Sequence, residues 1–224
     1  MNCARVLFIA IVLAFSSQLG SAQDLARYRV YVLESSLESV AAASGTRAAD
    51  AKMLHERPAK IQELEWRAPY SSAAHGQADP VQRAVFAFYD GALYQVVVSY
   101  DRGRTDGLGN SDIIESLTAV YGTPVVASAR SRPPAAFLGT VVLAQWDSPG
   151  SSLTLLRSAY SAEFQLVLVS KALSTRAQNA IREAGRLDTL EAPRRELEER
   201  NKELADAADA RDKLRTTNKA AFRP

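Results

Sequence analysis

The chain has little of the chemistry that thiol enzymes and metal sites need. Its 224 residues include one cysteine, Cys3, and two histidines, His55 and His75. A single cysteine cannot close a disulfide within the chain, and a metal site with several cysteine ligands is excluded. The formal net charge is only +2, which argues against nucleic acid or anionic lipid as the dominant partner.

Long apolar runs are also scarce, and the most pronounced one, VLFIAIVLAF in residues 6–15, lies near the N-terminus. Arg5 precedes this run, and Gly20 and Ala22 follow it as the small residues of a cleavage site. Residues 1–22 are therefore predicted to be a signal peptide, so that cleavage leaves Gln23 first. The run is short for a membrane span, which needs about 20 residues, and an uncleaved anchor helix is the alternative.

This prediction places the protein in the periplasm or the secreted space, with no stable membrane span after cleavage. The chain from residue 23 onward then has no cysteine, so its stability must come from an apolar core. Cys3 lies before the apolar run, where the lipidated cysteine of a lipoprotein cannot lie.

Charge density divides the remaining chain into two regions. Charged side chains make up 29 of the 153 residues from 23 to 175, but 22 of the 49 residues from 176 to 224. The first region can bury a core and the second mostly cannot. We therefore expect a globular domain over residues 23–173 and a charged, helical C-terminal tail over residues 174–224.

Alternating apolar residues predict antiparallel strands in the first region. The segment AVFAFY-DG-ALYQVVVSY consists of two apolar runs around Asp90-Gly91, the pair typical of a type I′ hairpin turn. An extended segment is expected at residues 27–32, a strand at IQELEW, and three more strands at VVLAQW, LTLLRSAY and FQLVLVS. A type II turn is expected at residues 148–151 between the first two of these.

Two short helices are expected to precede these strands. Ser35 is a candidate cap for the first helix, which Gly45 ends, and Ser111 or Asp112 is a candidate cap for the second. The order predicts an α+β fold, with an antiparallel sheet and helices on one side. It also suggests a tandem αβββ repeat over residues 35–100 and 111–170, with Trp66 and Trp146 near the end of the first strand of each half and buried in the core.

The tail is predicted to begin at Ser174 as a helix cap, with Pro193 in the first turn of a second helix or at a kink. Four acidic–basic pairs at i, i+4 would support the helix, and we expect them at Glu191–Arg195, Glu196–Arg200, Glu198–Lys202 and Asp209–Lys213. Leu190, Leu197 and Leu204 are seven residues apart, but Arg211 comes next. A single solvated helix and a coiled coil joining two copies both stay open.

The two helix ends SLESVAAASG and IIESLTAVYG, each followed by a run of strands, resemble small exported bacterial modules of helix plus antiparallel sheet. Examples are the BamE-like outer-membrane assembly lipoproteins and the beta-lactamase inhibitory proteins. The resemblance implies the fold and a non-catalytic, protein-binding role. The lipidated cysteine of the first family and the paired cysteines of the second are missing here, and neither family's binding residues can be placed on this chain.

Candidate catalytic groups are few, and none of them stands in a catalytic pattern. His55 is next to Glu56, but adjacent residues on a regular element point in different directions, and neither His55 nor His75 has the spacing of a zinc site. Ser111 lacks the G-x-S-x-G pattern of a hydrolase elbow. In the loop DRGRTDGLGNSD, turn and helix-cap chemistry accounts for the oxygen-bearing residues better than calcium does, and those residues are Asp101, Asp106, Asn110 and Asp112.

The sequence therefore assigns no catalytic residue, no cofactor and no metal site. We expect an exported, non-enzymatic protein that binds another protein or assists assembly. An exported hydrolase with a dispersed active site is the alternative, because a catalytic triad needs no local motif.

Overall fold

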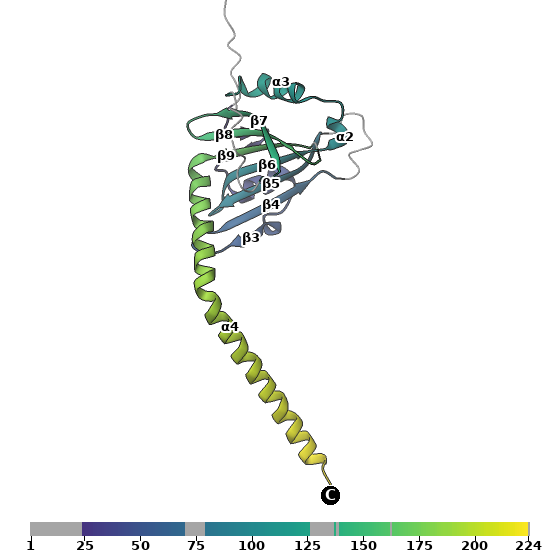
Figure 1. The fold of residues 1–224 in the computed structure, drawn as a ribbon, viewed down its shortest axis with the longest axis vertical. Helices are drawn as coiled ribbons and strands as arrows, with labels where there is room; N and C mark the ends of the chain where they lie inside the picture. Colours follow the sequence, from purple (N-terminus) through teal and green to yellow (C-terminus); the bar gives the residue numbers. More distant parts are fainter. Residues whose placement is uncertain (1–23, 70–78, 126–136, 138, 162, 224) are drawn as a thin grey trace, which may run out of the picture.

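The computed structural model of the chain describes residues 24–69, 79–125, 137, 139–161 and 163–223. The predicted signal peptide and His75 lie outside these residues. The described part forms an α+β fold, as predicted, from which one long helix extends (Figure 1).

A seven-stranded sheet is the centre of the fold, and every neighbouring pair of its strands is antiparallel. Across the sheet the order is β3-β4-β5-β6-β9-β8-β7. The strands are β3 (Lys52–His55), β4 (Ile61–Arg67), β5 (Val81–Tyr89), β6 (Ala92–Tyr100), β7 (Thr140–Asp147), β8 (Ser151–Ser158) and β9 (Phe164–Ser170).

The other elements are short, apart from the last helix. They are the paired strands β1 (Arg27–Tyr28) and β2 (Tyr31–Val32), the helices α1 (Leu37–Ser44), α2 (Arg102–Thr105), α3 (Asn110–Tyr121) and α4 (Lys171–Ala221), and a 3-10 turn, η1 (Ala48–Asp50). Helix α1 precedes the strands β4 to β6, and α3 precedes β7 to β9. Strands β6 and β9 join the two groups. The first group also contains β3, which the sequence did not predict, so it has four strands where the second has three. A tandem αβββ repeat therefore stays a prediction.

The main core lies on one face of the sheet, under α1 and α3. Leu64, Phe86 and Leu153 are fully buried there, Val40 of α1 joins them, and Tyr121 of α3 packs on Trp146. The alternation of a strand sends neighbouring residues to opposite faces. The apolar face of each helix thus covers the apolar face of the strands that follow it.

The hairpin between β5 and β6 confirms the clearest local prediction. Tyr89 pairs with Ala92, so the loop is the two residues Asp90 and Gly91. Their φ angles are 48° and 82°, which is the left-handed backbone that a type I′ turn requires at both positions. The Asp90 carboxylate also accepts a hydrogen bond from the backbone N–H of Lys60, which ties the turn to the start of β4.

Helix ends were predicted less well than strands. Gly45 ends α1 with φ 70°, as expected, but the cap is Ser36, whose hydroxyl accepts from the N–H of Ser39. Ser35 instead donates its hydroxyl to the carbonyl of Val32. The prediction of Ser111 as a cap is also wrong. Helix α3 starts at Asn110 with Gly109 as its cap, so Asp112 is not the cap residue either. The Asp112 carboxylate, inside the first turn, accepts from the N–H of Gly109.

Two turn predictions are corrected. Residues 27–32 are not one extended segment, because the chain reverses at Arg29, whose φ is 53°, and forms the hairpin of β1 and β2. The turn at residues 148–151 is not type II, since Gly150 has no positive φ. The hydroxyl of Ser148 holds that turn by bonding the hydroxyl and the N–H of Ser151.

Candidate functional site

The long helix α4 divides into two parts with opposite surroundings. Its 51 residues correspond to a length of about 76 Å. The first part, residues 171–187, lies against the sheet and is called the docked part here. The second part, residues 193–221, projects from the fold and is called the arm (Figure 1). The predicted cap at Ser174 is wrong, because the helix starts at Lys171, directly after β9.

The docked part packs through alanines onto the sheet face opposite α1 and α3. Ala177, Ala180 and Ala184 are buried, and the first two belong to a small cluster with Ile61 and Tyr94. Their spacing of three and four residues places them on one side of the helix. Because alanine has a short side chain, the helix backbone can approach the strands closely.

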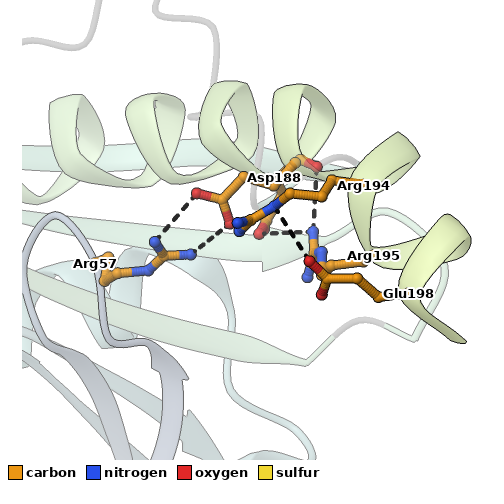
Figure 2. Close-up of polar contacts among 6 residues, drawn as sticks. Arg57, Asp188, Arg194, Arg195 and Glu198 are labelled. Carbon is orange, nitrogen blue, oxygen red and sulfur yellow. Dashed lines mark hydrogen bonds and ion pairs between the residues drawn. The ribbon is translucent and has the colours of Figure 1, made fainter. Parts of the chain in front are cut away.

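An ion pair marks the point where α4 leaves the body of the fold. Arg57, in the segment between β3 and β4, donates from Nη1 to Oε1 of Glu191 at 3.1 Å and from Nη2 to Oε2 at 2.8 Å. Figure 2 shows the Arg57 side chain reaching α4 beside Asp188. This two-pronged geometry fixes direction as well as distance. The hydrogen bonds from Arg57 lower the pKa of the Glu191 carboxyl.

Pro193 lies inside α4, just beyond this ion pair. A proline within a helix removes one backbone hydrogen bond and bends the axis, and Figure 1 shows α4 changing direction in its middle. The Arg195 guanidinium spans this stretch and donates to the carbonyl and the carboxylate of Asp188. The predicted Glu191–Arg195 pair is therefore wrong, since Glu191 pairs with Arg57.

The arm exposes all of its residues to solvent. From residue 193 to 223 none is even partly buried, although the segment contains leucines. The exposed fraction is 55% for Leu197, 64% for Leu204 and 62% for Leu214, and it is 63% for Leu190, which lies just before the arm. Ion pairs within the arm join Arg194 to Glu198 and Arg215 to Asp212. Among the residues that the structure describes, the arm thus leaves a set of large apolar side chains uncovered.

The candidate acid–base residues that the structure describes lie in separate parts of the fold. His55 ends β3 and Glu56 follows it, and both line a shallow hollow of about 150 Å³ together with Arg57, Leu187 and Asp188. This hollow is the space between β3 and α4, next to the Arg57–Glu191 pair. His75 lies outside the described residues. Ser111 is in the first turn of α3, a distant part of the fold (Figure 1).

The oxygen-rich loop at residues 101–112 caps helices, as the sequence predicted. The Asp101 carboxylate accepts from the N–H of Arg104 at the start of α2, and the Asn110 side chain accepts from Arg157. The Asp112 carboxylate accepts from the N–H of Gly109, the cap of α3. In the part of the chain that the structure describes, no group of three or more histidine, cysteine, aspartate or glutamate residues is placed to hold a metal ion.

Trp66 and Trp146 differ in their surroundings. Trp146 is 1% exposed, and its Nε1 donates to the carbonyl of Gly122, so its prediction as a core residue is confirmed. Trp66 is only partly buried and lines a hollow of about 340 Å³ with Tyr28 and Tyr31. Burial raises the pKa of Tyr28, which keeps its hydroxyl neutral. Arg29 and Asp79 also line this hollow.

The sequence indicated the charged arm but not the Arg57–Glu191 contact at its base. The charged composition from residue 176 onward indicated a solvated helix, whereas Arg57 and Glu191 are 134 residues apart and carry no local pattern.

Within the described ranges, none of the helices is both long and apolar enough to cross a membrane. Comparison of the chain with protein-family models, with curated proteins and with solved structures finds no match.

Proposed function

We propose that the chain is an exported, non-enzymatic protein-binding module of the cell envelope or secreted space, and that the arm is its binding element. The observation that carries the proposal is the exposure of Leu197, Leu204 and Leu214 along the arm, with Leu190 exposed just before it on the same helix (Figure 1). Single exposed leucines are common on protein surfaces. Four along one projecting helix are a typical surface for a partner helix or groove, which amphipathic helices fill with residues three, four and seven apart.

The contacts at the base of the arm support this role because they hold the arm away from the sheet. The docked alanines and the Arg57–Glu191 pair fix the base of the helix, so the arm is presented at a defined angle. A preorganised helix loses less conformational freedom on binding than a disordered tail does. Export remains the prediction of the N-terminal sequence, and protein binding is the role that the resemblance to envelope modules implies.

Site-specific crosslinking in the native compartment tests the proposal. A photoreactive residue replacing Leu197 or Leu204 should crosslink to protein in a defined band. A photoreactive residue replacing Lys202, on the other side of the helix, should give a weaker band. One replacing Val30, on the body, should not give this band. Equal crosslinking at all four positions, or at none, would rule out the arm as the binding element.

A further inference from the structure

We propose that the arm binds a second copy of itself in antiparallel orientation, as a two-stranded coil centred near residue 209. This inference rests on the proposed function, since it names the partner of the same surface. Two properties of the arm identify a second copy as the partner: the spacing of its apolar residues and the distribution of its charge.

The leucines from Leu190 to Leu214 lie on one stripe along the helix, which polar residues interrupt at three positions. The stripe advances alternately by three and four residues, the spacing that keeps side chains on a coiled-coil seam. The stripe contains Leu190, Leu197, Leu204, Ala207, Leu214 and Ala221, with Pro193, Arg200, Arg211 and Asn218 between them. Leu214 does not fit the seven-residue spacing of the first three leucines alone, but it falls on this stripe. All members from residue 193 onward are exposed.

Charge selects the orientation of the pair. Residues 196–209 carry six acidic and two basic side chains, and residues 210–223 carry five basic and one acidic, so the two halves have net charges of −4 and +4. Parallel copies would place like halves side by side. Antiparallel copies place the acidic half of one along the basic half of the other, which favours that orientation.

The stripe supplies a register for this arrangement. When the two-fold axis passes near residue 209, Leu204 faces the second copy's Leu214 and Leu197 faces its Ala221. Ala207 faces Arg211, whose aliphatic stem can cover the alanine while its guanidinium reaches the acidic half of the other helix. Ala207, Ala208 and Ala210 lie at the centre. These small residues allow the two helices to approach closely where they cross.

The dimer would have one body at each end. The arm of one copy extends about 42 Å from residue 193 to residue 221 at 1.5 Å per residue, and the overlap uses most of that length. The two bodies therefore do not collide. The leucine layers are few and three stripe positions are polar, so we expect a reversible dimer that added salt weakens.

A charge-swap experiment on the purified full chain tests the inference. Variant A replaces Glu196, Glu199 and Glu203 by Lys, and variant B replaces Arg211, Lys213 and Arg215 by Glu. Each variant alone has two like-charged halves and should stay monomeric in sedimentation equilibrium at concentrations where the unaltered chain dimerises. An equimolar mixture should form the A–B dimer. Homodimers of A or B as stable as the unaltered dimer would overturn the charge argument.

Leucine replacements test the stripe, with a control on the opposite side of the helix. The pair Leu204→Lys and Leu214→Lys should weaken dimerisation by at least tenfold. Ala205→Lys and Thr216→Lys add the same charge but point away from the stripe. This pair should change the dimerisation constant by less than about threefold, an effect typical of rim charges. Circular dichroism checks that helix content is equal. Equal loss in both pairs would overturn the stripe.

Cysteine crosslinking establishes the orientation, with Cys3→Ser as the background. A mixture of Leu197→Cys and Ala221→Cys chains should form the mixed disulfide, and Leu197→Cys alone should not crosslink. Crosslinking of Leu197→Cys alone would show parallel helices and overturn the inference.

The inference and the proposed function can fail separately. If the unaltered chain is monomeric at every concentration while the arm crosslinks to a different protein in the native compartment, the inference fails and the proposed function stands. If neither occurs, both fail.

Discussion

The two parts of α4 use apolar residues in opposite ways. The docked part buries alanines, with Ala177 fully covered, whereas the arm exposes leucines that are more than half accessible. Burial in this helix therefore follows the fit to the sheet rather than the hydrophobicity of the side chain. Alanine suits a close contact between a helix and strands. Leucines left in solvent favour a contact that one copy of the chain does not supply.

The largest contrast is expected between the core and the arm. Trp146→Ala should reduce the free energy of unfolding by about 3–5 kcal/mol, because it removes a buried aromatic residue and leaves a cavity. Leu204→Ala in the monomer should change it by less than about 0.5 kcal/mol, as for other surface sites. Urea unfolding of both variants at low protein concentration measures the difference. A comparable loss in the two would mean that the arm packs on the body.

Enlarging an alanine separates the two parts within the same helix. Ala177→Leu adds volume at a fully buried position and should destabilise the body by about 1–3 kcal/mol through overpacking. Ala205→Leu makes the same change on the exposed arm and should be close to neutral. Thermal melts of the two variants provide the measurement. If Ala177→Leu melts like the unaltered chain, the docked part does not pack tightly on the sheet.

Removing the arm should leave the body folded. A chain that ends after Ala192 keeps Glu191 and should melt within about 2–4 °C of the full chain, the shift that 1 kcal/mol causes in a domain of this size. It should lose helical circular dichroism. A chain that ends after Leu190 also lacks the partner of Arg57 and should melt slightly lower. Unfolding of the longer truncation would show that the arm stabilises the body.

The smallest effect concerns pH and the base of the arm. Pairing with Arg57 lowers the pKa of Glu191, so the ion pair stabilises the docked helix above the unfolded value of about 4.3. That contribution is lost as the pH falls through the lower, folded pKa. After correction for the intrinsic exchange rate, which itself falls on acidification, the protection of the amides at residues 186–192 should decrease in this range. Arg57→Gln should remove the pH dependence, and its persistence in that variant would exclude the pair as the cause.

Local sequence signals were sufficient for most of the sheet. Alternation and short apolar runs predicted the strands β4 to β9, and Asp90-Gly91 predicted the turn between β5 and β6. These features depend on neighbours in the chain, since side-chain period and turn geometry are local properties. The cap of α1 was one residue off because Ser35 and Ser36 both precede the helix start, and the structure selects Ser36.

Long-range contacts escaped the sequence analysis for a physical reason. The charge density from residue 176 onward concealed Ala177, Ala180 and Ala184, whose small side chains look neutral in a solvated helix and yet form the docked face. The Arg57–Glu191 pair joins two exposed segments that only the folded sheet brings together. The stripe of the arm was visible in part, but its last leucine, Leu214, fits only when the alternate spacing of three and four is followed.

The direct passage from β9 to α4 has a mechanical consequence. Ser170 ends the strand and Lys171 begins the helix, so no slack linker separates them. Strand β9 is hydrogen-bonded on both sides, to β6 and to β8. A tensile load on the tip of the arm would first strain the Arg57–Glu191 contact and the alanine face, and then enter the interior of the sheet. A force applied to the arm is thus transmitted to an interior strand of the sheet, and it does not detach an edge strand.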